Sequence, residues 1–77
     1  MCDGDMAVKT LYKRLGLRLV YERNRKNLSQ EELAFLTAID RTYIARIEGG
    51  KANPSIKVLN KLSRKLDLKV HELLEGV

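Results

Sequence analysis

Two arginines lie five positions apart in a short segment, residues 40–48, whose residue pattern is that of a helix. Ile44 and Ile47 mark its buried side, because apolar residues three positions apart share one helix face. The positions left facing outward are Arg41, Thr42, Ala45 and Arg46, with Tyr43 at the margin. A guanidinium offers a planar fork of donors that matches either a guanine edge or a phosphate. A solvated arginine is the alternative that residue type alone leaves open.

Other kinds of chemistry find little support in the sequence. His71 is the one histidine and Cys2 the one cysteine of the 77 residues, so no ligand cluster has metal-binding spacing. There is no glycine-rich phosphate loop and no Ser/His/Asp set. We therefore expect no enzyme, no cofactor, no metal and no small-molecule effector. The formal charge of +5 favours an anionic partner, which means nucleic acid or an acidic membrane surface.

Three capping signals divide the chain into helices. Residues 29–32, Ser-Gln-Glu-Glu, form a capping box that predicts a helix start at Ser29. Asp40 predicts the start of the next helix after a short turn at residues 37–39, and Ser55 predicts the start of a fourth. Gly49 and Gly50 end the third helix, since glycine accepts the left-handed conformation found after helix ends.

Apolar residues at helical spacing predict the core. A first helix is expected over residues 8–26, and a short last helix follows the fourth. The residues expected to face inward are Leu11, Leu15 and Leu19; Leu33 and Leu36; Ile56, Leu59, Leu62 and Leu66; and Val70, Leu73 and Leu74. Gly16 weakens the first helix unless a neighbouring helix passes close to it. The prediction is an all-α domain of five helices over residues 8–77, preceded by a disordered segment, residues 1–7.

The first residues are acidic, and no apolar run approaches the length of a membrane span. We expect neither a signal peptide nor a membrane anchor. We expect instead a cytoplasmic protein whose translation starts at Met1 or Met6. A membrane-binding role for the basic first helix is the weakest alternative, because its apolar stripe is needed in the core.

Four segments in order resemble one family. They are residues 28–34 (LSQEELA), 39–44 (IDRTYI), 47–51 (IEGGK) and 53–55 (NPS). This pattern is similar to the Cro and lambda-repressor-like helix-turn-helix family over about residues 15–75. Residues 34–36 and 40–44 look most like the controller proteins of restriction–modification systems, which are short dimeric regulators. The resemblance implies a transcriptional regulator that places its third helix in the major groove of double-stranded DNA.

The resemblance assigns roles to individual residues. The candidates for reading base edges are Arg41, Thr42, Tyr43, Ala45 and Arg46. Arg46 is expected to contact a base, whereas Arg41 faces either a base or a phosphate, and Tyr43 either contacts DNA or packs against the turn. Backbone phosphates are expected to be contacted by Arg23, Gln30, Lys51, Asn53 and Ser55, with Lys57 a weaker candidate. Arg23 and Glu48 are expected to form an ion pair that fixes the angle of the reading helix.

Two positions depart from the family pattern. Ala38 stands in the turn where glycine is usual, and it is strained by roughly 1 kcal/mol if its φ is positive. Glu22 stands where an apolar residue is common.

The resemblance also implies a homodimer formed through the last two helices. The candidate interface residues are Val70, Leu73, Leu74 and Val77. Their alternative role is to complete the core of the monomer, and for Leu73 this alternative is favoured. A two-fold dimer would present two reading helices ~34 Å apart and would prefer an inverted-repeat operator. The competing interpretation is a phage-type repressor, or an antitoxin that binds a protein partner as well as DNA.

Overall fold

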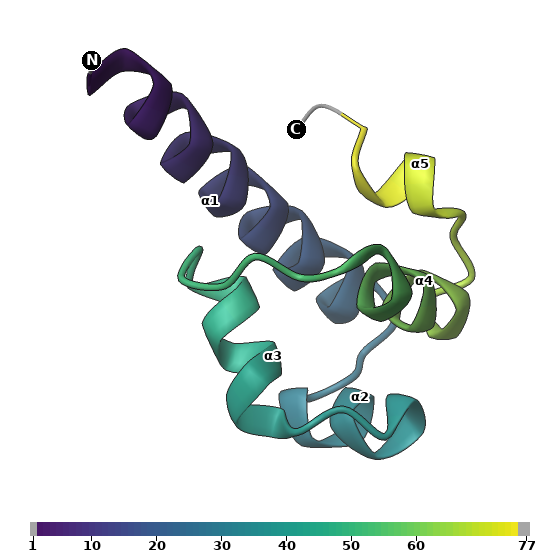
Figure 1. The fold of residues 1–77 in the computed structure, drawn as a ribbon. Coiled ribbons are helices and arrows are strands. Elements are labelled where there is room, and N and C mark those ends of the chain that lie inside the picture. The colour runs from purple at the N-terminus through teal and green to yellow at the C-terminus, as the bar shows by residue number, and fades with distance from the viewer. Residues whose placement is uncertain (1, 76–77) are drawn as a thin grey trace.

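The computed structural model describes the backbone of residues 2–75 and the side chains of residues 9–75. These residues form five helices and no strand. Their bounds are α1 Cys2–Arg25, α2 Gln30–Thr37, α3 Arg41–Glu48, α4 Ile56–Lys65 and α5 Val70–Leu73. The later part of α1 lies across the domain, whereas its N-terminal part projects beyond the other helices (Figure 1). The predicted all-α class is confirmed.

The start of α2 follows directly from its capping box. The Glu32 amide donates to the Ser29 hydroxyl at 3.0 Å, and the Ser29 amide donates to the Glu32 carboxylate at 2.8 Å. Two amides that the helix would leave unpaired are thereby satisfied. At the other end, Ala38 caps the helix in the left-handed conformation with φ of 58°. The expected strain at this alanine is therefore present.

The third helix is bounded by an aspartate and a pair of glycines, as predicted. The Asp40 carboxylate accepts from the Thr42 amide at 2.8 Å, and α3 ends at Glu48. Gly50 has φ of 74°, and a Cβ there would lie 2.9 Å from the Cα of Lys13. The chain can therefore turn closely against α1 only because no side chain stands at position 50.

The core consists of two clusters of buried side chains. The larger one joins all the helices but α5, and its buried members are Leu19, Leu33, Ile44, Ile47, Ala52, Leu62 and Leu66. The smaller one joins α1, α4 and α5 through Leu15, Leu59 and Leu73. Leu73 is fully buried there, so it completes the monomer core, which was the favoured of its two predicted roles, and it is not available as an interface residue. Val70 and Leu74 are only partly buried, and Val77 lies outside the described residues.

Three leucine and isoleucine positions expected in the core are exposed instead. Leu36 is 43% exposed because α2 buries Leu33 and Thr37, four positions apart, rather than the pair three apart. Leu11 is 44% exposed at the edge of an apolar groove that it lines with Leu59 and Leu74. Ile56 is 67% exposed at the first residue of α4.

The first helix begins at Cys2 and not at Val8 as expected, and its backbone runs through most of the segment predicted to be disordered. No proline interrupts residues 2–7, and each added residue extends a formed helix by one hydrogen bond.

Glu22 is a buried carboxylate at a position where the family usually has an apolar residue. Its burial is possible because two arginines of its own helix bind it. Its carboxylate accepts from Arg18 Nε and from Arg25 Nε, each at 2.9 Å. Burial would raise the pKa of Glu22, but the hydrogen bonds from Arg25 and Arg18 outweigh that effect and hold the pKa below its usual range. The two ion pairs explain how α1 accommodates a carboxylate at position 22, where an apolar residue is common in the family.

Candidate nucleic-acid interface

The exposed face of α3 carries the residues that the sequence singled out. Ile44 and Ile47 are buried, at 0% and 1% exposure, and fix which side of the helix faces the core. Arg41, Thr42 and Arg46 are exposed on the opposite side. The remaining two candidates, Ala45 and Tyr43, are half-buried, and Tyr43 packs against the larger core cluster.

Both arginines of this face rest against neighbouring polar groups. Arg41 Nη1 donates to the side-chain oxygen of Gln30 at 3.4 Å. Arg46 Nη2 donates to the carbonyl of Lys51 at 3.3 Å. These long, exposed hydrogen bonds cost little to break, so either guanidinium is available to a better acceptor.

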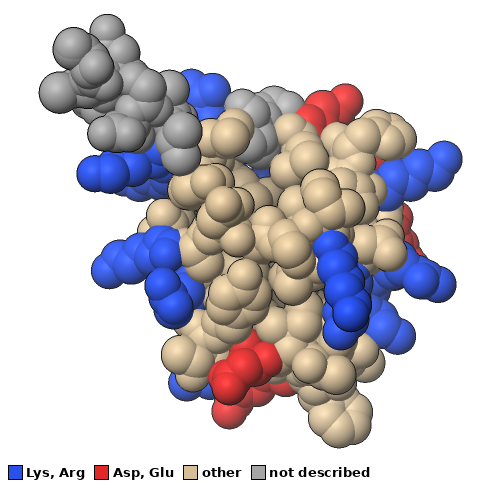
Figure 2. All heavy atoms as spheres, in the orientation of Figure 1, with Lys and Arg blue, Asp and Glu red and all other residues tan. Residues whose placement is uncertain are grey.

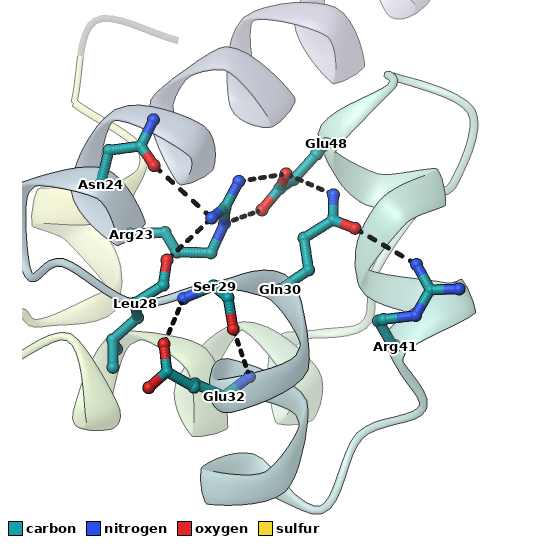
Figure 3. Close-up of polar contacts among 8 residues, drawn as sticks. All are labelled: Arg23, Asn24, Leu28, Ser29, Gln30, Glu32, Arg41 and Glu48. Carbon is teal, nitrogen blue, oxygen red and sulfur yellow. Dashed lines mark hydrogen bonds and ion pairs between the residues drawn. The ribbon is translucent and has the colours of Figure 1, made fainter.

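A polar network ties α3 to α1 and α2 (Figure 3). Arg23 binds the Glu48 carboxylate through two donors, Nε at 2.7 Å and Nη2 at 3.1 Å. Arg23 Nη1 also donates to the carbonyl of Leu28 at 2.8 Å, and Gln30 Nε2 donates to Glu48 at 2.8 Å. The expected ion pair is therefore confirmed, and it is bidentate. One carboxylate at the end of α3 is held by both α1 and α2.

The close approach of α1 to the end of α3 depends on Gly16. A Cβ at this position would lie 2.5 Å from the carbonyl oxygens of Ile47 and Glu48. Any side chain there would push α3 away from α1, because the atoms it would meet are backbone atoms. The neighbouring helix that the sequence required for Gly16 is α3.

The phosphate candidates fall into two groups. Gln30 and Arg23 line a shallow hollow at the N-terminal end of α2, together with Ser29, Glu31 and Arg41. Lys51, Asn53 and Ser55 are exposed on the segment after α3. Arg23 is already engaged by Glu48, and its side chain is only 13% exposed. The Ser55 hydroxyl accepts from the Val58 amide at 3.2 Å and keeps its own proton to donate.

Comparison with known proteins adds a family to this geometry. The helix-turn-helix model HTH_3 matches residues 19–73, which include α2, α3 and the whole larger core cluster. The chain belongs to this helix-turn-helix family. The resemblance inferred from the motif segments is thereby confirmed.

Three relatives place this helix-turn-helix protein more closely. The control protein C.SmaI of Serratia marcescens is 34% identical over 74 residues, covering 96% of this chain and 88% of C.SmaI. The structure of the restriction–modification controller protein C.AhdI from Aeromonas hydrophila has a TM-score of 0.78 at 42% identity, covering 80% of this chain and 94% of that one. SinR, in a structure of the SinR–SinI complex, has a TM-score of 0.78 at 38% identity, with 80% of this chain and 61% of SinR covered.

Figure 2 shows basic side chains of the helix-turn-helix protein on both flanks of one face, and acidic side chains at the lower edge and the upper right of that face. On this face, the positive charge alone therefore does not locate the interface. Within residues 2–75, no helix is long and apolar enough to cross a membrane. Among the described side chains, no cluster of His, Cys, Asp or Glu could bind a metal ion.

Sequence reasoning missed one role at this interface. Gln30 was singled out as a phosphate contact, but its amide also bridges Glu48 to Arg41 and so connects the ion pair to the exposed face of α3. No local signal predicts this bridge, because it depends on how α2 and α3 cross.

Proposed function

We propose that this protein is a sequence-specific DNA-binding regulator that inserts α3 into the major groove. The observation that carries the proposal is that α3 exposes Arg41, Thr42 and Arg46 while a partly buried ion pair fixes its other end. A major groove accepts one α-helix and lets its outward side chains reach the base edges. Family membership and the control-protein relatives support the same function.

The two arginines of α3 are proposed to read guanines, and Thr42 to contact a thymine methyl. A good bidentate arginine–guanine pair contributes about 1–3 kcal/mol of discrimination between bases. Ala45 is small and permits close approach of the helix. Tyr43 is proposed to contact DNA from the margin of the face, since part of its side chain packs against the larger core cluster.

Phosphates on either side of the groove are proposed to be bound from both groups of candidates. Gln30 lies in the first turn of α2, where unpaired amides and the helix dipole attract an anion. Lys51, Asn53 and Ser55 follow α3 and would meet the opposite strand. Arg23 adds positive charge to the hollow at the N-terminal end of α2 while it stays paired with Glu48.

A homodimer is proposed to form at an apolar groove between α1, α4 and α5. The groove is lined by Leu11, Leu74, Ile56, Pro54 and Asn53 among others. Ile56 and Leu11 were predicted to lie in the core but are exposed, and in this groove they would serve as apolar contacts to the second copy. Because the groove adjoins the segment that follows α3, a second copy seated there brings its own α3 near the first. Two neighbouring reading helices fit an inverted repeat with half-sites about one DNA turn apart.

Within this function, a controller of a restriction–modification system acting in the cytoplasm is the specific role we propose. Its support is the near full-length match to C.SmaI and to the C.AhdI structure. The second candidate is a regulator that also binds a protein partner, as a phage-type repressor or antitoxin would, and the match to SinR in a complex with SinI favours it. This chain spans less than two thirds of SinR.

Selection of duplexes from a random pool, followed by sequencing at two salt concentrations, tests the DNA-binding role. The proposal predicts an enriched inverted repeat bound ~10³-fold or more tightly than bulk DNA. Arg14→Ala removes an exposed arginine on α1 and should leave the enriched sequence unchanged, whereas Arg46→Ala should relax one position in each half-site. Salt-sensitive binding without any enriched sequence would mean counterion release alone and would overturn the proposal.

A further inference from the structure

A phenylalanine on α2 has no role in the core or in the proposed DNA interface. Phe35 is 87% exposed, the largest exposure among the large apolar side chains that the structure describes. Beside it lies Leu36, 43% exposed, and the two line a mostly apolar hollow with Leu28. An aromatic side chain that leaves this much apolar surface in water loses the stabilisation that burial gives.

The acidic end of this surface lies toward the start of α2. Glu31 and Glu32 line the same hollow as Phe35. Glu32 is engaged by the Ser29 amide in the capping box. Glu31 is exposed and makes no side-chain hydrogen bond or ion pair with the described residues.

The basic end lies beyond Leu36, on α4. Leu36 also lines a second hollow, whose other members include Lys61, Arg64 and Lys65. All three basic side chains are exposed, and none forms an ion pair within residues 9–75. Leu36 is thus shared by the two hollows and lies between opposite charges.

We propose that this surface, which we call the α2–α4 patch, pairs with the same patch of a second copy of the chain. A two-fold axis through the Phe35–Leu36 centre would place the acidic end of each copy against the basic end of the other. The same axis would seat Phe35 of each copy against the apolar hollow of its partner. A patch with an apolar centre and opposite charges at its two ends is complementary to itself in this way. Two α2 helices would also run antiparallel, which sets their dipoles favourably.

This contact is separate from the proposed dimer groove at Ile56 and does not require DNA. The lining residues of the two surfaces do not overlap. A chain with both surfaces would form dimers through one and join them through the other.

Sedimentation velocity of the full chain without DNA, over a range of concentrations, tests the patch. Phe35→Ser should weaken one self-association step on the order of tenfold. The matched control is Leu17→Ser, which removes a leucine that is 61% exposed on α1 and should change nothing. Circular dichroism checks that both variants remain helical. If Phe35→Ser and Leu17→Ser sediment alike, the patch does not pair with itself.

Charge reversal distinguishes self-pairing from any other use of the patch. Glu31→Lys alone and Arg64→Glu alone should each weaken association, because like charges would then face each other. The double variant should recover it, because each copy again presents opposite charges to its partner. Failure of the double variant to recover association would overturn the proposal. If Phe35→Ser leaves only monomer, the patch is the sole self-association surface, and the dimer groove at Ile56 fails instead.

Discussion

Removing the carboxylate at the end of α3 should cost a large part of the stability of the domain. Glu48 accepts hydrogen bonds at 2.7 and 3.1 Å from Arg23 and at 2.8 Å from Gln30, and the side chains of the ion pair are only 13% (Arg23) and 6% (Glu48) exposed. Glu48→Ala would leave the guanidinium partly buried with the Leu28 carbonyl as its main acceptor. Breaking a buried pair in this way costs about 3–5 kcal/mol. A chain of this length has a free energy of unfolding of about 4–12 kcal/mol in total.

Urea unfolding at pH 7, followed by circular dichroism, measures this cost. The matched control, Glu75→Ala, removes an exposed carboxylate outside the proposed contact surfaces and should change the free energy of unfolding by no more than about 0.5 kcal/mol. Replacing both partners, with Arg23→Met and Glu48→Leu together, should recover much of the loss because no unpaired charge remains buried. If Glu48→Ala is no more destabilising than Glu75→Ala, the ion pair does not fix α3 and the reasoning is wrong.

Three further predictions concern single positions. Ala38→Gly should raise the free energy of unfolding by about 0.5–1 kcal/mol, because glycine adopts φ of 58° without strain; an unchanged urea midpoint would contradict this. In Gly16→Ala the new Cβ meets backbone of α3, which should cost roughly 1–3 kcal/mol of stability, while better helix propensity should return about 1 kcal/mol. We expect a net loss, seen as a lower Tm in thermal unfolding, and a higher Tm would refute the close approach. The pKa of Glu22 is held down in the folded state by its arginines, against the effect of burial, so its stabilisation is complete above about pH 4.5 and is lost as the pH falls through the lower folded value. Glu22→Gln should flatten that part of the stability profile, and an unchanged acid limb would show that another group is responsible.

Local signals predicted the helix boundaries around the interface well. Ser29, Asp40 and Ser55 each cap a helix through a bond to an amide two or three residues away, so a few neighbouring residues determine the outcome. The inward positions of α3 were also predictable, since Ile44 and Ile47 leave a single choice of buried face.

Positions that depend on where helices cross were predicted less well. Leu36 and Ile56 have the right spacing for a core but lie just outside the area that neighbouring helices cover. The Gln30 bridge and the burial of Glu22 needed the folded arrangement, although Arg18 and Arg25 lie at helical spacing from Glu22 and could have signalled it.

The most direct test of the central claim compares wild-type protein with Arg46→Ala. For each protein, the affinity is measured for every single base-pair variant of the selected site. For wild-type protein, a base-pair change at a contacted position should cost about 1–3 kcal/mol of binding free energy. Arg46→Ala should bind the selected site more weakly and lose its discrimination at one position in each half-site only, with the other positions unchanged. An equal loss of affinity for every sequence would mean that Arg46 contacts phosphate, and no loss at all would mean that α3 does not read the groove.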